Sequence, residues 1–272
     1  MNPDINIEGD LVIKKYSMEV DKEYDKAKVL CDIAMGNGFF SVEPLTLKAT
    51  ENKISFKYLY ATGSVRDLYR EYLKKGDNKE LMLNVTFEAG KILGNIHNNL
   101  ILKTKKTWFP PQKFIDALVE LGCPSKEDLL INLPQAFLHC DYGITNIQYL
   151  EQDDSITIVV YDSSPNNYYT KYTDSYGPIY VDIGCFISGI NGLVPIYDYP
   201  FIDWDKINEV KHSFVSGYES YKGCKLIPYY VDLFSYGCAN CYFSHKYKSS
   251  LLQYLAMKAL FNRKKSNFPI SA

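Results

Sequence analysis

The chain has 272 residues, enough for one large domain or for two lobes around a cleft. Its 46% hydrophobic and 23% charged residues are typical of a globular protein, and its net charge of −2 gives no basic field for nucleic acid. No apolar run reaches the roughly 20 residues of a membrane helix, and the acidic N-terminus lacks the apolar core of a secretory signal. We therefore expect a cytoplasmic protein without nucleic-acid or membrane partners, and nothing in the sequence indicates an oligomeric state.

The first 60 residues predict a small β-rich unit with one helix. Two β-prone runs flank Glu8-Gly9-Asp10, which is typical of a hairpin turn. Strict alternation from Ile54 to Tyr60 predicts a strand with one buried face. The predicted elements are a hairpin over residues 5–16, a helix over residues 20–35, and strands over residues 41–48 and 53–60.

Helical patterns dominate after Ala61-Thr62-Gly63, around one short β-rich segment. The predicted helices cover residues 64–76, 79–99, 114–121, a segment capped by Ser125 and Asp128, and residues 203–221 and 245–263. The predicted strands cover residues 136–138, 147–150 and 155–161, the last two forming a hairpin. This order predicts an α+β protein with a small lobe over residues 1–62 and a helical lobe over residues 63–272.

The β-rich segment contains the sequence His-Cys-Asp-Tyr-Gly-Ile-Thr-Asn over residues 139–146, and the following hairpin ends at Asp162. Phosphoryl transfer needs a group that orients the incoming hydroxyl and oxygen ligands for magnesium. Asp141 is suited to the first task, and Asn146 and Asp162 are suited to the second. The spacing therefore predicts a phosphoryl-transfer site.

These residues resemble the aminoglycoside phosphotransferases, choline kinases and related small-molecule kinases. The resemblance includes Ala-Gly-Lys-Ile-Leu-Gly-Asn-Ile-His at 89–97, Ile-Lys-Lys at 13–15 and Tyr-Val-Asp-Ile-Gly at 180–184. It implies a two-lobed protein-kinase-like fold, with ATP and Mg²⁺ as cofactors and a small-molecule hydroxyl as acceptor (aminoglycoside, choline or sugar-like).

The resemblance also implies roles for single residues. Asp141 would be the catalytic aspartate, Asn146 and Asp162 would bind Mg²⁺, and Lys14 would contact the nucleotide phosphates. Lys15 is the alternative to Lys14, because adjacent strand residues point to opposite faces.

Five further residues would bind the cofactor or support the site. Glu23 would form the ion pair that holds the lysine. Residues 57–62, with Tyr58 and Tyr60, would form the hinge that offers backbone groups to adenine. The His139 side chain would hydrogen-bond the loop backbone, and Asp182 would lie below the catalytic loop or cap the next helix.

The sequence departs from the family in its small lobe. It has no glycine-rich phosphate loop, and only about ten residues precede the lysine-bearing strand, so we expect a truncated lobe. This favours an alternative, a weak or inactive kinase-like protein that binds nucleotide or a partner. A protein kinase is disfavoured, because Ser163-Ser164 follows Asp162 in place of Phe-Gly. Residues 165–177 form an extra loop where a substrate or activation segment would lie.

Two further sets of residues suggest ligands. An acidic set, which would attract a cationic acceptor, comprises Asp198, Asp203 and Asp205. A set with some zinc-ligand character comprises Cys224, Cys238, Cys241 and His245, although buried free thiols are the favoured interpretation.

Overall fold

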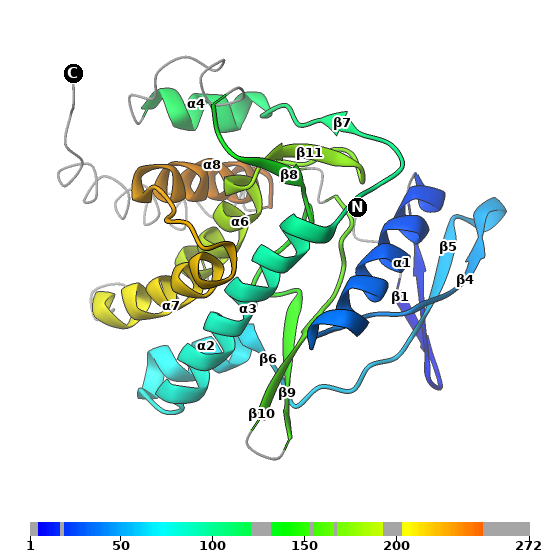
Figure 1. The fold of residues 1–272 in the computed structure, drawn as a ribbon, viewed down its shortest axis with the longest axis horizontal. Helices are drawn as coiled ribbons and strands as arrows, with labels where there is room; N and C mark the ends of the chain where they lie inside the picture. Colours follow the sequence, from blue (N-terminus) through cyan, green and yellow to red (C-terminus); the bar gives the residue numbers. More distant parts are fainter. Residues whose placement is uncertain are drawn as a thin grey trace.

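The computed structural model describes residues 5–16, 19–120, 132–152, 155–165, 168–192 and 203–246. The expected α+β architecture is confirmed: a β-rich N-terminal region precedes a mainly helical C-terminal part. In Figure 1 the N-terminal strands and helix α1 (Val20–Asn37) lie on one side, and α6 (Tyr180–Gly192), α7 (Trp204–Lys222) and α8 (Pro228–Lys246) lie on the other. Helix α3 (Lys79–Asn99) lies between them.

The small sheet has the strand order β1-β2-β5-β4, and all neighbours are antiparallel. Its strands are β1 (Ile5–Glu8), β2 (Leu11–Lys15), β4 (Pro44–Lys48) and β5 (Lys53–Lys57). The predicted hairpin is confirmed, with Gly9 in the left-handed region at φ 61°. Helix α1 covers one face of the sheet, where Val20 and Ala27 pack against Ile54 and Phe56.

Two strand predictions in this region are wrong in detail. The strand expected over residues 41–48 is two strands, because Phe40–Ser41 (β3) pairs in parallel with β10 of another sheet. The strand expected over residues 53–60 ends at Lys57. The strand ends there because its partner β2 begins at Leu11, opposite Lys57, and the next backbone N–H, that of Tyr58, bonds the carbonyl of Asp10 in the β1–β2 turn.

The second sheet has the order β3-β10-β9-β6, and the third has the order β7-β11-β8. Their remaining strands are β6 (Gly63–Ser64), β7 (Lys106–Thr107), β8 (Gln135–Phe137), β9 (Ile147–Gln152), β10 (Ser155–Val160) and β11 (Ser175–Pro178). The predicted hairpin of β9 and β10 is confirmed. It follows residues 139–146 directly and returns the chain to Asp162, which pairs with Lys14 of the small sheet.

The helices follow from local signals in the sequence. Ser64 caps α2 (Val65–Lys75) by accepting the N–H of Asp67 at 3.1 Å, and Gly76 ends it at φ 78°. Asp203 caps α7 in the same way. The predicted helix at residues 114–121 is α4 (Gln112–Glu120). The segment after Ser125 and most of residues 245–263 lie outside the described residues.

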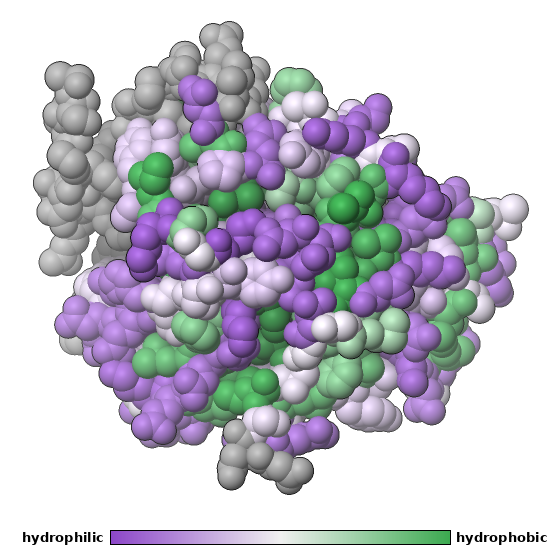
Figure 2. Space-filling view, viewed as in Figure 1, coloured by the Kyte–Doolittle hydropathy of each residue, from purple (hydrophilic) through white to green (hydrophobic). Residues whose placement is uncertain are grey.

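The main core lies among α3, α6, α7 and α8, where Phe186 and Phe214 stack with ring centroids 3.8 Å apart. No helix in the described ranges is long and apolar enough to cross a membrane. Figure 2 shows hydrophilic side chains over most of the visible face and apolar side chains exposed between α1 and α3. The apolar stripe follows the boundary between the N-terminal region and the helical part.

Candidate active site

A cavity of about 260 Å³ lies between the small sheet, α1 and the segments that flank β9 and β10. Small-lobe residues and residues of the predicted motif line it together, among them Lys14, Glu23, His139, Asn146 and Asp162. The fold therefore brings these five predicted site residues to one cavity, although they are distributed over about 150 residues of the sequence.

The alternation of β2 decides between the two candidate lysines. The Lys14 side chain is buried, whereas Lys15 is exposed. The Lys14 ammonium forms an ion pair with Asp162 and lies 5.0 Å from the centre of the Tyr16 ring. Lys14 is thus the lysine that faces the motif.

Asn146 connects the parts of the motif. Its side-chain amide donates to the backbone carbonyl of Asp141 at 3.0 Å and to the Asp141 carboxylate at 2.9 Å. Its backbone carbonyl accepts the N–H of Tyr161 at 2.9 Å. These bonds orient the Asp141 carboxylate and fix the residue before Asp162 against the 139–146 loop.

The oxygen donors fit a magnesium ion. Because the Asn146 amide nitrogen donates to Asp141, its amide oxygen faces away from that residue. The Asp162 contacts with Lys14 and the Ser164 N–H both use Oδ1. Burial alone raises the pKa of Asp162, but the Lys14 charge and hydrogen bonds lower it below its usual value. One amide and one carboxylate suit Mg²⁺, which usually takes one or two carboxylates together with substrate phosphates.

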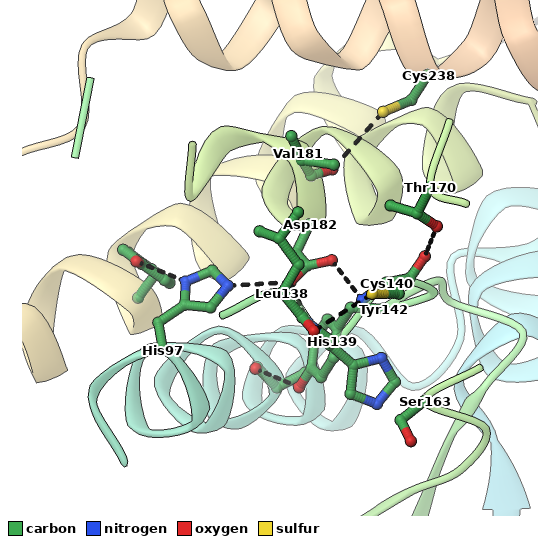
Figure 3. Close-up of polar contacts among 12 residues, drawn as sticks. His97, Leu138, His139, Cys140, Tyr142, Ser163, Thr170, Val181, Asp182 and Cys238 are labelled. Atoms are coloured by element: carbon green, nitrogen blue, oxygen red, sulfur yellow. Dashed lines mark hydrogen bonds and ion pairs between the residues drawn. The ribbon is translucent and has the colours of Figure 1, made fainter. Parts of the chain in front are cut away.

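Asp182 bonds the backbone at the start of the 139–146 loop. Its buried carboxylate accepts the backbone N–H of His139 at 2.6 Å and of Cys140 at 3.0 Å. His97, from α3, bonds the same carboxylate at 3.0 Å and the hydroxyl of Tyr218 at 2.9 Å. Figure 3 shows Asp182 between the His97 ring and the loop.

The hydrogen bond to the loop backbone that was expected of the His139 side chain is not formed in the part of the chain that the structure describes. The backbone N–H of His139 bonds Asp182, but its two ring nitrogens are buried and have no hydrogen-bond partner among the described residues. Figure 3 shows the ring beside Ser163. Burial, followed by the charge of Lys26, lowers the pKa of His139 to about 3, so the ring is neutral at physiological pH.

Glu23 is buried at the cavity but does not hold the lysine. Lys14 pairs with Asp162 instead, and the Glu23 carboxylate accepts the hydroxyl of Thr173 at 2.5 Å. Burial raises the pKa of Glu23, and the nearby Lys26 charge opposes that shift. Glu23 therefore joins α1 to the extra loop over residues 165–177.

The two hinge tyrosines differ in position. Tyr58 lines the cavity, whereas the Tyr60 side chain is 72% exposed and is not among the residues that line it. The rings contact each other edge to face at 4.7 Å. The role of residues 57–62 in binding adenine remains a prediction.

Two residues at the site, Lys26 and Tyr169, were not predicted from the sequence. Lys26 is fully buried beneath the loops, although a lysine on an amphipathic helix ordinarily points to water. The hydroxyl of Tyr169 lies 3.4 Å from the Asp141 carboxylate. The sequence places Tyr169 in the extra loop where a substrate or activation segment would lie, but the tyrosine-rich pattern does not single out this residue.

The further ligand sets do not form sites in the described residues. Asp203 caps α7, and it and Asp205 are exposed at the start of that helix, while Asp198 lies outside the described residues. No group of three or more His, Cys, Asp or Glu residues in the described ranges is placed to hold a metal. The thiol of Cys238 donates to the carbonyl of Val181 at 3.6 Å, and the side chain of His245 is not described.

Comparison with solved structures identifies the architecture. A glucosamine kinase matches with a TM-score of 0.58 and 12% identity, over 97% of this chain and 78% of that one. The same enzyme in complex with glucosamine, ADP and inorganic phosphate matches with a TM-score of 0.57 and 12% identity, over 96% and 76% of the two chains. The chain has the fold of small-molecule kinases.

Two other small-molecule kinases share the fold. A microcompartment-associated aminopropanol kinase matches with a TM-score of 0.56 and 13% identity, over 98% of this chain and 93% of that one. A Plasmodium vivax ethanolamine kinase matches with a TM-score of 0.52 and 14% identity, over 97% and 83% of the two chains. No protein-family model matches the sequence, and no curated protein matches it. The kinase-like fold implied by the motif is confirmed, although the sequences have diverged widely.

Proposed function

We propose that the protein is an ATP- and Mg²⁺-dependent phosphotransferase that phosphorylates a hydroxyl group of a small molecule. The main support is one observation: Lys14, Asn146 and Asp162 line a single cavity, and the Asn146 amide also bonds Asp141. The groups to which we assign phosphate binding, metal binding and orientation of the hydroxyl are therefore adjacent in a fold shared with small-molecule kinases.

Each residue has a defined part in this reaction. Asp141 would accept a hydrogen bond from the acceptor hydroxyl and take its proton as the phosphoryl group moves. Asn146 and Asp162 would hold Mg²⁺, which neutralises phosphate charge when bound. The Lys14 ammonium would leave Asp162 in part to contact the nucleotide phosphates. Positioning and charge compensation provide most of the rate in such transfers.

The acceptor class we propose is an amino alcohol or amino sugar. The similar structures are those of kinases named for glucosamine, ethanolamine and aminopropanol, each of which has an amine and a hydroxyl. The exposed positions of Asp203 and Asp205 do not support the expected role of these residues in binding the cation.

The test is ADP release from MgATP with matched pairs of acceptors. We expect turnover with glucosamine, ethanolamine or aminopropanol, and less with glucose, ethylene glycol or propanol, which lack the amine. Asp141→Asn should lower kcat by about 100-fold or more, because it removes the proton acceptor. Full activity in Asp141→Asn would contradict the assigned role. MgATP binding without turnover on any of these amines or alcohols would favour the nucleotide-binding alternative.

A further inference from the structure

Lys26 is a buried cation that the proposed mechanism leaves unused. It lies on α1, three residues after Glu23, and its relative exposure is 0%. Its ammonium donates to the backbone carbonyls of Ser163 at 2.8 Å, His139 at 2.9 Å and Thr173 at 3.1 Å, and lies 3.3 Å from the Cys140 sulfur. An ammonium has three N–H donors, so three carbonyls can satisfy it.

The three carbonyls belong to three different segments of the site. His139 begins the catalytic motif, Ser163 follows the metal-binding Asp162, and Thr173 belongs to the loop that carries Tyr169. A buried charge is costly unless polar groups surround it, and unpaired buried carbonyls are costly as well. Lys26 and the three segments therefore stabilise one another only in this arrangement.

The peptide between His139 and Cys140 is held at both of its polar ends. Its N–H donates to the Asp182 carboxylate at 3.0 Å, and its carbonyl accepts from Lys26 at 2.9 Å. Figure 3 shows the Asp182 side of this arrangement. One buried anion and one buried cation thus fix the peptide that immediately precedes Cys140, the residue before Asp141.

The backbone next to these contacts is strained. Cys140 has φ 81° and Asp162 has φ 43°, and both are non-glycine residues in a region that favours glycine. Such conformations persist when the surrounding structure over-determines them. Lys26 bonds the carbonyl of His139, which precedes Cys140, and the carbonyl of Ser163, which follows Asp162. Each bond is therefore next to a strained residue and can hold its backbone in place.

We propose that Lys26 is a positioning residue that holds the catalytic loop, the metal-binding loop and the loop at Thr173 in the arrangement that phosphoryl transfer requires. This inference rests on the proposed function. Lys26 is not among the residues that line the cavity, so it acts through the backbone of its neighbours. Because Glu23 on the same helix bonds the Thr173 hydroxyl, a displacement of α1 would move all three loops.

The test compares Lys26→Met and Lys26→Gln with Lys28→Met, an exposed lysine on the same helix. We expect Lys26→Met to lower kcat at least 30-fold while the KM for the acceptor changes less than 3-fold. Amide hydrogen exchange in peptides that cover residues 139–146 and 162–165 should become at least 10-fold faster, while peptides of α7 keep the wild-type rates. Lys28→Met should match wild type in both measurements.

A rescue variant tests the part played by strain. Glycine adopts positive φ without steric cost, so Cys140→Gly in the Lys26→Met background should restore kcat at least 5-fold relative to Lys26→Met alone. No restoration would contradict the role of Lys26 in holding Cys140.

The exchange measurement separates this inference from the proposed function. Absence of turnover by wild type with every acceptor would contradict the proposed function, while loop exchange would still decide the role of Lys26. Wild-type exchange and wild-type kcat in Lys26→Met would overturn the inference. If Lys26→Met does not fold, kcat and loop exchange are measured on Lys26→Gln. Slower turnover with faster loop exchange would support the positioning role of Lys26, and wild-type values of both would overturn it.

Discussion

The His139 ring lies at the centre of the site, and its neutrality makes stability depend on pH. Its pKa is lowered from 6.5 to about 3 by burial and then by the charge of Lys26. As the pH falls below 6.5, the unfolded chain therefore binds a proton that the folded chain excludes until about pH 3. The free energy of unfolding should fall by up to about 1.4 kcal/mol per pH unit over this range.

Replacing this histidine should flatten that pH dependence. We expect His139→Phe to lose less stability than wild type between pH 6.5 and pH 5, by up to about 1.4 kcal/mol per pH unit. Urea unfolding at several pH values measures the slope. His212→Gln, which changes an exposed histidine on α7, should keep the wild-type slope. An unchanged slope in His139→Phe would mean that the ring is protonated in the folded protein.

At the level of single residues, the sequence pointed to residues that lie at a fixed spacing along one short segment. The motif grouped Asp141, Asn146 and Asp162, and the structure has Asn146 and Asp162 lining the cavity and Asn146 bonded to Asp141, because a short loop and one hairpin connect them. It did not reveal Lys26, because a helix pattern cannot show that three distant carbonyls lie above one of its lysines. The partner of Lys14 was missed for the same reason: it depends on how the two parts of the chain pack.

Glycines allow α3 and α7 to pack closely, and this contact gives a prediction about helix packing. A Cβ atom at Gly90 of α3 would lie 2.0 Å from the Phe214 carbonyl oxygen, and one at Gly217 of α7 would lie 1.9 Å from that of Phe87. Each clash is with backbone, so relief requires the helices to separate. We expect Gly90→Ala and Gly217→Ala each to destabilise the protein by about 3 kcal/mol or more.

A glycine in open space provides the matched control. Gly36 on α1 has no atom within 4 Å of an added Cβ, so Gly36→Ala should stabilise by up to about 1 kcal/mol, the usual helix preference for alanine. Gly94→Ala should have an intermediate effect, because its nearest neighbour is the Tyr221 side chain at 3.2 Å. Denaturant unfolding measures all four variants. Equal effects of Gly90→Ala and Gly36→Ala would show that α3 and α7 are not in close contact.

Helices were more predictable than sheet pairing. Caps and apolar spacing placed α2, α3 and α7 to within a residue or two, because these signals are local. The two-residue strands β3, β6 and β7 have no pattern of their own and exist because a longer strand lies beside them. The separation of β3 from β4 depends on the position of β10, over 100 residues later in the chain, which no local signal encodes.

On the scale of the whole molecule, an ion pair at the cavity connects two parts of the chain. Lys14 belongs to the small sheet, and Asp162 follows β10 of the second sheet. The ammonium of Lys14 is buried, so removing Asp162 leaves an uncompensated charge and lowers the stability of the unliganded protein. A nucleotide that binds both sides of the cavity should oppose this loss and stabilise the folded state.

We therefore predict that MgATP raises the melting temperature and that Asp162→Ala abolishes the magnesium-dependent part of the rise. Binding to the folded state alone contributes about 2.7 kcal/mol at a ligand concentration 100 times Kd. Each variant is compared with its own unliganded form, because Asp162→Ala lowers the starting stability. Asp32→Ala, at an exposed carboxylate of α1, should behave as wild type. Two results would contradict the metal role of Asp162: equal protection by ATP with MgCl₂ and with EDTA, or a magnesium-dependent rise that persists in Asp162→Ala. The protein would then bind nucleotide without the metal role assigned to Asp162. Phosphoryl transfer by these residues would lose its main electrostatic support.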